Sequence, residues 1–401
     1  MQLLKNYTAI IVFAALAPST TLVAGCGADD KVPIDEPYTQ EESRNEDSTY
    51  ATPTSEHAEL VELTERYLAE RANRVTTNGV AMRVAGLTSV PITTTFSERF
   101  GLDAARLDQR RETLRGINGG YSRAQVKVKV TGIDVEGERV TLQVIEHTKL
   151  FYPSGPADAP EAEEYALRRD LVFLRGPGGW LLDDTTVAEP NDALLPVTEH
   201  WDDAAPTSAT PPPDRLPSST ERETAINDQL VEASSPDDIV TLASYSYPAM
   251  TAYALAHWSS YNSSYRAYQN DCTNFISQIT SAGGWSYVGG GPFDDRTDKS
   301  KWYYGSFTWT TSYTWAGAEN WYWFATGSGR TLILPSVWNM QETDVLQADW
   351  DKNNSIDHTM FVTKTDAAGE KYLTYHTTDT LNKKLSTLLS QYSAWWYAHS
   401  T

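Results

Sequence analysis

Two hydrophobic periods occupy the first half of the chain, a helical one followed by a strand-like one. Apolar residues such as Leu60, Leu63 and Tyr67 recur at helical spacing and predict a helix over 57–75, and a second helical stretch follows at 103–117. Valine and leucine then alternate with polar residues, which predicts strands at 124–131, 139–147, 165–175 and 180–184. Helices followed by an antiparallel meander indicate an α+β fold.

The second half of the chain predicts a short amphipathic helix that begins at Cys272. Asp271 is a typical N-cap residue, and the pair Gly283-Gly284 supplies a helix stop. An apolar stripe lies between them at Phe275, Ile276 and Ile279. The helix dipole and the unpaired N–H groups at a helix start favour a thiolate, so Cys272 is a candidate nucleophile. A buried, inert cysteine is the alternative interpretation.

A thiolate nucleophile needs a general base, and two histidines on a predicted hairpin are the candidates. The strands cover 356–363 and 371–376, with the turn at 366–369. If residue 364 pairs with residue 370, His358 lies directly opposite His376, with Cβ atoms about 4.5–5.5 Å apart. A slip of one residue would put the two rings on opposite faces of the sheet.

Residues 245–401 resemble the amidase domain of bacterial surface proteins, a branch of the papain-like cysteine hydrolases related to NlpC and CHAP domains. The matching segments are Asp271-Cys272-Thr273-Asn274-Phe275-Ile276-Ser277-Gln278, Asp357-His358-Thr359-Met360-Phe361-Val362-Thr363 and Tyr375-His376-Thr377-Thr378-Asp379, with shorter ones at 253–254, 282–284, 313–320 and 344–346. Thr343 departs from the family, which has glycine there. The resemblance implies a helix that bears the cysteine and packs on an antiparallel sheet. It also implies Cys272 as nucleophile, His358 as base and His376 as the residue that orients the base.

The first 25 residues form a predicted signal peptide, whose apolar run at 9–17 is too short to span a membrane. Leu22-Val23-Ala24-Gly25-Cys26 resembles a bacterial lipobox, which makes Cys26 the predicted lipidation site. The protein is then expected outside the cytoplasm, attached to the cell membrane by acyl chains. Ordinary secretion, with cleavage near Ala24 or Gly25, is the alternative. Lipidation also accounts for the only other cysteine of the chain, which could otherwise pair with Cys272 alone.

Composition divides the mature chain into two domains and two connecting segments. Residues 26–55 are acidic and polar and predict a flexible tether, whereas 190–240 are proline-rich and predict a linker. Between them, 56–189 form a smaller α+β domain whose element order resembles SnoaL-like cone domains. No cluster of histidines or carboxylates is evident there, so we expect an accessory role. Residues 241–401 hold the whole predicted site, and we expect them to fold alone.

Charge and composition limit the partners. Residues 241–401 carry 10 basic and 13 acidic side chains, so residues 1–240 hold −18 of the net charge of −21. A chain this acidic lacks the basic surface that nucleic acids require. Polar residues alternate from Asp349 to Asp357 like half of a calcium loop, but Asn354 and Met360 stand where glycine and glutamate belong. A polar loop is therefore favoured over calcium, no Cys/His cluster indicates zinc, and no cofactor is expected.

The favoured function is that of a lipid-anchored, extracytoplasmic cysteine hydrolase of amide bonds, with cell-wall (peptidoglycan) peptides as the expected substrate. The N–H of Cys272 is one candidate oxyanion donor, and the second candidates are Tyr261, Tyr265 and Gln269. Residues 241–401 hold 11 of the 13 tryptophans, and the aromatic insert 302–323 fits either core packing or a wall of the substrate groove. Two alternatives stay open. One is a non-catalytic lipoprotein that binds wall material or a partner, and the other is an acyl transferase with the same Cys-His chemistry.

Overall fold

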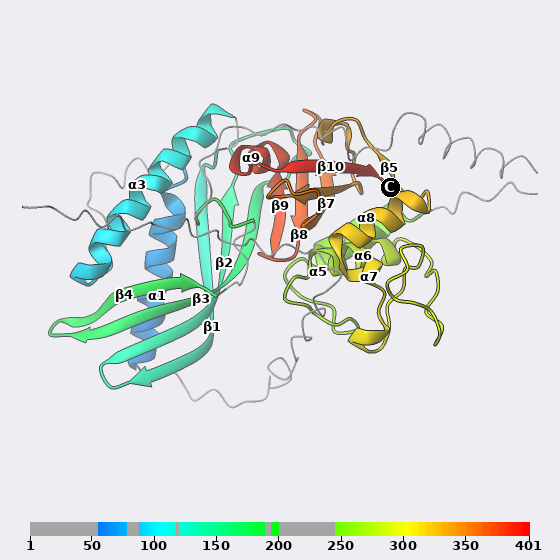
Figure 1. Cartoon of the computed structure of the whole chain (residues 1–401). Coiled ribbons are helices and arrows are strands. Elements are labelled where there is room, and N and C mark those ends of the chain that lie inside the picture. Colours follow the sequence, from blue (N-terminus) through cyan, green and yellow to red (C-terminus); the bar gives the residue numbers. More distant parts are fainter. Residues whose placement is uncertain (1–54, 78–87, 118–119, 189–193, 200–244) are drawn as a thin grey trace, which may run out of the picture.

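The computed structural model of the chain describes residues 55–77, 88–117, 120–188, 194–199 and 245–401. They form two α+β units that lie next to each other (Figure 1). The first unit contains α1 (Ser55–Asn73), α3 (Thr94–Gly116), β1 (Arg123–Glu136), β2 (Arg139–Phe151), β3 (Ala162–Gly176) and β4 (Gly179–Val187).

The second unit alternates short helices with short strands. Its helices and helical turns are α5 (Tyr247–His257), α6 (Cys272–Ala282), η2 (Thr308–Thr310), α7 (Tyr313–Ala316), α8 (Ala318–Gly327), η3 (Val337–Asn339) and α9 (Leu385–Gln391). Its strands are β5 (Leu332–Ile333), β6 (Val345–Asp349), β7 (His358–Thr365), β8 (Lys371–Tyr375), β9 (Thr380–Lys384) and β10 (Trp395–Ser400).

The helices and strands predicted for the first unit are confirmed. The strands extend to or beyond their predicted ends, whereas α1 and α3 start earlier than predicted and end at Asn73 and Gly116, before the predicted ends at 75 and 117. α3 starts at Thr94 rather than at 103, because the Thr93 hydroxyl accepts a hydrogen bond from Phe96 N at 3.2 Å and caps the helix. The turn between β1 and β2 contains Gly137 with φ at 64°, a backbone conformation that glycine adopts without strain.

The described strands form one 10-stranded antiparallel sheet that runs through both units. Its order is β1-β2-β3-β9-β8-β7-β6-β10-β5, and β4 pairs with β3. The units meet where β3 pairs with β9, with Glu164 opposite Leu381 and Tyr165 opposite Thr380. The expected α+β class with an antiparallel sheet is therefore confirmed. The finer comparisons with papain-like and cone-like folds remain predictions.

Side chains across this junction tie the two units together. The Tyr152 hydroxyl donates to the Asn382 carbonyl at 2.6 Å and lies 3.2 Å from Lys384 N. The Tyr152 and Tyr372 rings pack edge to face within one hydrophobic cluster. The first unit thus covers the edge of β9. Because of this contact we now predict that 241–401 depends on the first unit, in place of the sequence-based prediction that it folds alone.

Part of the predicted 190–240 linker is packed in the interior. Leu194, Leu195, Val197, Thr198 and Glu199 are all buried. The Thr378 hydroxyl donates to the Leu194 carbonyl, and the Tyr392 hydroxyl donates to the Leu195 carbonyl, both at 2.8 Å. The rest of that segment, the signal peptide 1–25 with Cys26, and the tether up to 54 lie outside the described residues.

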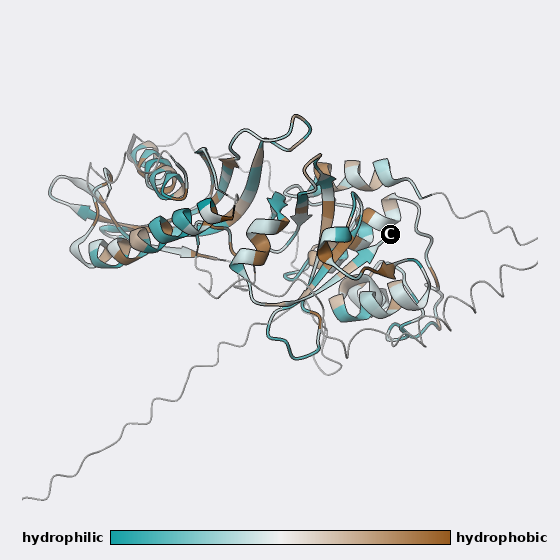
Figure 2. Ribbon diagram, turned by 90° about the horizontal axis from the view of Figure 1, so that it is seen from above, coloured by the Kyte–Doolittle hydropathy of each residue, from teal (hydrophilic) through white to brown (hydrophobic). Residues whose placement is uncertain are grey.

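Different residues pack on the two faces of the sheet in the second unit. One face, called the α6 face here, packs against α6 and α8 through Phe275, Ile276, Trp321, Phe324, Val345 and Phe361. The other, called the α9 face, buries Leu346, Ala348, Met360, Val362, Leu388 and Trp396. Figure 2 shows hydrophobic residues concentrated along the strands of this unit, whereas the two long helices of the first unit carry many hydrophilic residues. In the part of the chain that the structure describes, no helix is long and apolar enough to cross a bilayer.

Candidate active site

The helix that carries the cysteine starts where the sequence predicts. α6 begins at Cys272 and ends at Ala282. Gly283 is its C-cap, and Gly284 follows with φ at 103°, in the region that favours glycine. Residues 272–280 of this helix are all buried, because one side packs on the sheet and the other against α5 and α7. The helix is held firmly enough to fix the position of Cys272.

The Cys272 side chain is fully buried on the α6 face. It lies in a cluster with Ala318, Tyr322, Ile356 and Tyr397. Cys272 is disulfide-bonded in this structure, and no described cysteine has a free thiol, which differs from the expectation of a thiol at this position. Because a nucleophile must be a thiolate, nucleophilic chemistry at Cys272 requires its reduction first.

Asp271 occupies the N-cap position, but its side chain has another role. It makes no capping hydrogen bond to the helix. Its carboxylate accepts hydrogen bonds from Tyr268 N and Asn274 Nδ2, each at 2.8 Å, and lies 2.6 Å from His376 Nδ1. The prediction of Asp271 as the N-cap is right for the position and wrong for the hydrogen bond, because buried partners engage the carboxylate.

His376 is held as an imidazolium beside the start of α6. Its ring lies between those of Phe275 and Tyr261, at centroid distances of 3.8 and 4.1 Å. Nδ1 meets the Asp271 carboxylate and Nε2 lies 2.8 Å from the carbonyl oxygen of His257. Both partners can only accept, so both ring nitrogens carry protons. Burial alone lowers the pKa of His376, but the hydrogen bond to Asp271 and the nearby carboxylates raise this pKa above its ordinary value overall.

His358 lies on the other face of the sheet from Cys272. It is the first residue of β7 and pairs with Ala348 of β6, so the two side chains share the α9 face. Its ring contacts those of Tyr375 and Trp350, at centroid distances of 5.5 and 6.1 Å. The next residue, Thr359, points toward α6 instead. Burial lowers the pKa of His358 to about 3, so the ring is neutral.

The predicted register of the β7–β8 hairpin is wrong. Lys364 pairs with Tyr372 rather than with residue 370, and a β-bulge at Thr363 shifts the pairing so that Phe361 lies opposite Thr374. Continued toward the start of β7, this register puts residue 359 opposite His376. His358 and His376 therefore do not face each other, and the predicted contact in which His376 orients His358 is absent from the hairpin.

Sequence reasoning missed a row of buried polar side chains on the α6 face. Thr359 of β7 and Gln347 of β6 lie opposite each other, and Tyr397 of β10 lies opposite Gln347. His399 lies two residues beyond Tyr397 and so points to the same face. The aromatic run Trp395-Trp396-Tyr397 before His399 was the signal that could have predicted β10 and placed residues 395, 397 and 399 on one face.

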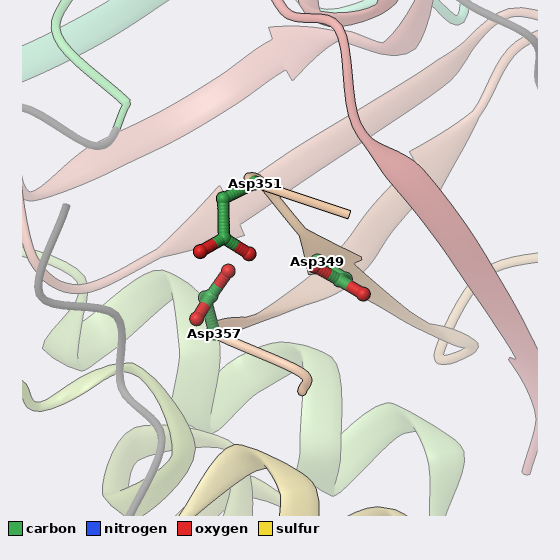
Figure 3. Close-up of side chains that lie close together, drawn as sticks. All are labelled: Asp349, Asp351 and Asp357. Carbon is green, nitrogen blue, oxygen red and sulfur yellow. The ribbon is translucent and has the colours of Figure 1, made fainter. Parts of the chain in front are cut away.

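The acidic loop between β6 and β7 brings three carboxylates together (Figure 3). Asp349, Asp351 and Asp357 each offer an oxygen within 4.8 Å of the others, the only such group among the described residues. Asp349 accepts hydrogen bonds from Asn353 N and Asn354 N. Burial raises the pKa of Asp349 to about 6 and that of Asp357 to about 7. The oxygens are of the kind that bind Ca²⁺, but loop amides already bond to them and the glycine and glutamate of a calcium loop are missing.

The tryptophans of the aromatic insert serve mainly as core. Trp302, Trp315 and Trp321 are fully buried, whereas Trp309 is 68% exposed and stacks on Phe307 at 4.8 Å. A surface cleft of about 630 Å³ lies elsewhere, between the start of α5 and the C-terminal residues 400–401. Neither Cys272 nor the two predicted histidines line that cleft.

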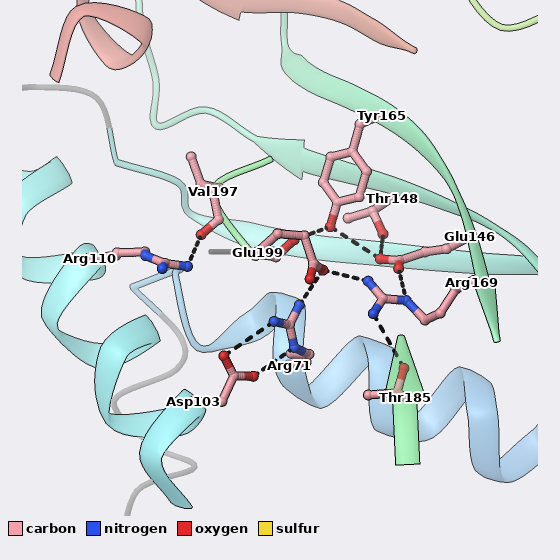
Figure 4. A network of polar contacts seen from close by, with 11 residues as sticks. Arg71, Asp103, Arg110, Glu146, Thr148, Tyr165, Arg169, Thr185, Val197 and Glu199 are labelled. Atoms are coloured by element: carbon pink, nitrogen blue, oxygen red, sulfur yellow. Dashed lines mark hydrogen bonds and ion pairs between the residues drawn. The ribbon is translucent and has the colours of Figure 1, made fainter. Parts of the chain in front are cut away.

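The first unit contains a buried charge network that the sequence did not reveal (Figure 4). Arg71 Nη1 and Arg169 Nη2 each lie 2.5 Å from Glu199 Oε1, and Arg169 Nε lies 2.9 Å from Glu146 Oε2. Arg71 also binds Asp103 at 3.0 Å. The expectation that no carboxylates converge here is wrong, because these residues come from distant positions along the chain. Arg71 and Arg169 are each paired with carboxylates, and Arg110 donates to the Val197 carbonyl at 3.3 Å, which is typical of a structural network.

Comparison with known proteins identifies the second unit. No curated protein matches the chain. Among solved structures, the Kfla4162 protein from Kribbella flavida is 18% identical, and the match covers 33% of this chain and 90% of that chain with a TM-score of 0.21. Residues 244–399 match the family model described as "Putative amidase domain", in agreement with the boundaries that the resemblance gave. The second unit of this chain, residues 244–399, is therefore similar to this amidase family.

Proposed function

We propose that this protein is a cysteine hydrolase of amide bonds that uses Cys272 as its nucleophile. The observation that carries the proposal is that the family match covers α6, where Cys272 is the first residue of a rigid, buried helix. The helix start offers the dipole and the N–H groups that stabilise a thiolate. Cys272 acts only as a free thiol, so the disulfide must be absent from the active protein.

The chemistry follows from the position of Cys272. The thiolate attacks the amide carbonyl carbon, and the carbonyl oxygen becomes an oxyanion that the backbone N–H of Cys272 is placed to stabilise. Collapse of the tetrahedral intermediate breaks the C–N bond, and the amine leaves with a proton from the general acid. Water then cleaves the thioester and regenerates the thiolate. Of the suggested second oxyanion donors, Tyr261 already donates to Asp379 at 2.9 Å.

His358 is the proposed base on the family resemblance. Its neutral ring is in the protonation state that a base requires. To reach the Cys272 sulfur it must turn from the α9 face to the α6 face, which requires rearrangement of the first residue of β7. For His376 we propose a different role from the predicted one. His376 forms a buried ion pair with Asp271, and this pair fixes the position of the start of α6.

Location and substrate rest on the sequence. The lipobox-like Leu22–Cys26 segment supports a lipid anchor at Cys26 and a position outside the cytoplasm. Because Cys26 is the only other cysteine, its lipidation leaves Cys272 as a thiol in the anchored protein. Cell-wall peptides are the proposed substrate, because a surface-anchored amidase meets them first. An acyl transferase would use the same thioester and differ only in the amine that resolves it.

The test is amine release from purified peptidoglycan peptides by the reduced full-length protein. We expect release by the wild type in dithiothreitol, none by Cys272→Ser, and full release by Cys26→Ser, which removes the other cysteine as a matched control. Equal release by wild type and Cys272→Ser would contradict cysteine catalysis. Omission of dithiothreitol should abolish release by the wild type if reduction is the activating step.

A second candidate function is non-catalytic binding of wall material or a partner. Two observations favour it: the disulfide at Cys272 and the position of His358 on the α9 face. This function predicts that Cys272→Ser binds peptidoglycan as well as the wild type does and that neither protein releases amine. Co-sedimentation with insoluble peptidoglycan measures the binding.

A further inference from the structure

A continuous chain of buried hydrogen bonds leads from β10 to the Cys272 sulfur. His399 Nε2 lies 3.0 Å from Gln347 Oε1, and Gln347 Nε2 donates to Thr359 Oγ1 at 3.0 Å. Thr359 Oγ1 lies 2.9 Å from Thr273 Oγ1, which lies 3.6 Å from Cys272 Sγ. All five side chains are fully buried, so water does not compete for these bonds.

The partners of Gln347 and His399 determine which atom donates in each hydrogen bond of this series. Gln347 Nε2 also meets the carbonyl oxygen of Ala318 at 2.9 Å, and a carbonyl can only accept. The amide nitrogen of Gln347 therefore faces Ala318 and Thr359, and its oxygen faces His399. His399 Nε2 must then carry a proton and donate it to that oxygen. The other ring nitrogen accepts from the Thr331 hydroxyl at 3.1 Å, which keeps the ring neutral.

The same donor and acceptor roles follow for the two threonine hydroxyls between Gln347 and the sulfur. Thr359 accepts from Gln347, which leaves its own proton for Thr273 Oγ1. Thr273 then has its proton for Cys272 Sγ. In this arrangement the hydroxyl protons of Thr359 and Thr273 both have an acceptor, and the sulfur is the last acceptor in the series. A group that receives a hydrogen bond is stabilised in its charged form.

We propose that Thr273, supported by Thr359, Gln347 and His399, is a positioning residue that stabilises the thiolate of Cys272. The inference rests on the proposed function, because it concerns the reduced cysteine. Thr273 follows Cys272 in α6, so its hydroxyl keeps its place beside the sulfur when the disulfide is reduced. The row of polar residues on the α6 face thus acts through one hydroxyl on the nucleophile.

Other titratable groups also surround Cys272, and they are the same in the wild type and in the Thr273 variants. The phenols of Tyr322 on α8 and Tyr397 on β10 belong to its cluster. The Asp271–His376 ion pair lies at the helix start, and the Glu319 carboxylate accepts from Ile356 N at 3.0 Å. Substitution of Thr273 changes none of these groups, so a change in the titration of Cys272 reports on the hydroxyl.

The experiment measures the rate of iodoacetamide alkylation of the reduced full-length protein from pH 5 to pH 10, with Cys26→Ser as the common background. Thr273→Val keeps the shape of the side chain but removes its donor, and a hydrogen bond to a charged group is strong enough to raise the midpoint by about one pH unit. Thr273→Ser keeps the hydroxyl and should keep the wild-type midpoint. Thr280→Val is the matched control, because Thr280 is equally buried in α6 and its hydroxyl bonds only to backbone carbonyls of that helix.

The outcomes separate this inference from the proposed function. A raised midpoint in Thr273→Val alone supports the hydrogen-bond chain. An unchanged midpoint in folded Thr273→Val, or an equal shift in Thr280→Val, overturns it. A wild-type midpoint at the value of an ordinary thiol, about 8.5, contradicts the nucleophile itself. If Thr273→Val does not fold by circular dichroism, Thr359→Val decides, since it removes the next donor and must shift the midpoint in the same direction.

Discussion

The buried pair of Asp271 and His376 should contribute strongly to the stability of the second unit. Each side chain is about 1% exposed, and the carboxylate accepts three hydrogen bonds, one of them from the imidazolium. Removal of one partner leaves the other without its counter-charge, which costs roughly 3–5 kcal/mol in buried pairs. Asp271→Asn and His376→Phe should each lower the free energy of unfolding by an amount in this range. His376→Phe keeps a ring between Phe275 and Tyr261, so its effect reports on the lost proton donors.

A double-mutant cycle isolates the pair from other losses. Unfolding in urea of the two single variants and of the double variant should give a coupling energy of about 2 kcal/mol or more. His257→Ala is the matched control, because His376 bonds to the backbone carbonyl of His257 and not to its ring. A coupling below about 0.5 kcal/mol would refute the ion pair, since that is the error of such cycles.

The pH dependence of stability gives the same pair an independent signature. Because the pKa of His376 is raised on folding, its contribution is complete below the ordinary histidine pKa. It is lost as the pH rises through the higher value in the folded protein. The free energy of unfolding of the wild type should therefore fall as the pH rises above about 6.5, and His376→Phe should lack this component.

Three further predictions concern the ends and the junction of the two units. Tyr152→Phe removes the hydroxyl that bonds Asn382 and Lys384, so the free energy of unfolding in urea should fall by about 1–2 kcal/mol, whereas a value within error of zero would contradict a joint sheet. A fragment of residues 241–401 exposes the β9 edge and should aggregate; a soluble fragment with a cooperative thermal transition contradicts this. Cys26→Ser should move the protein from the membrane fraction to the medium, and unchanged membrane retention contradicts the lipid anchor.

Much of the fold could be predicted from the sequence because it depends on local periodicity. The start of α6 at Cys272 followed from the apolar stripe and from the glycines at its end, and the strands of the first unit followed from strict alternation. The pairing of β3 with β9 could not be predicted. These strands are more than 200 residues apart in the sequence. Only two residue pairs join them, Glu164 with Leu381 and Tyr165 with Thr380.

The candidate site was harder to predict because it depends on which face each side chain occupies. One bulge at Thr363 changes the register of β7 and β8, and with it the face on which His358 lies relative to His376. No local signal marks that bulge. The partner of Asp271 is likewise more than 100 residues away. Residue types pointed to the chemistry of Cys272, whereas the hydrogen bonds around it arise only from tertiary packing.

The central claim is that reduced Cys272 is a nucleophile, and its titration tests this most directly. In reduced, folded Cys26→Ser protein, the rate of alkylation by iodoacetamide should follow a single titration whose midpoint lies at least about one pH unit below the ordinary thiol value of 8.5. Peptide mapping should place the label on Cys272. A midpoint at or above 8.5, or labelling only after denaturation, would show that Cys272 is a buried structural cysteine.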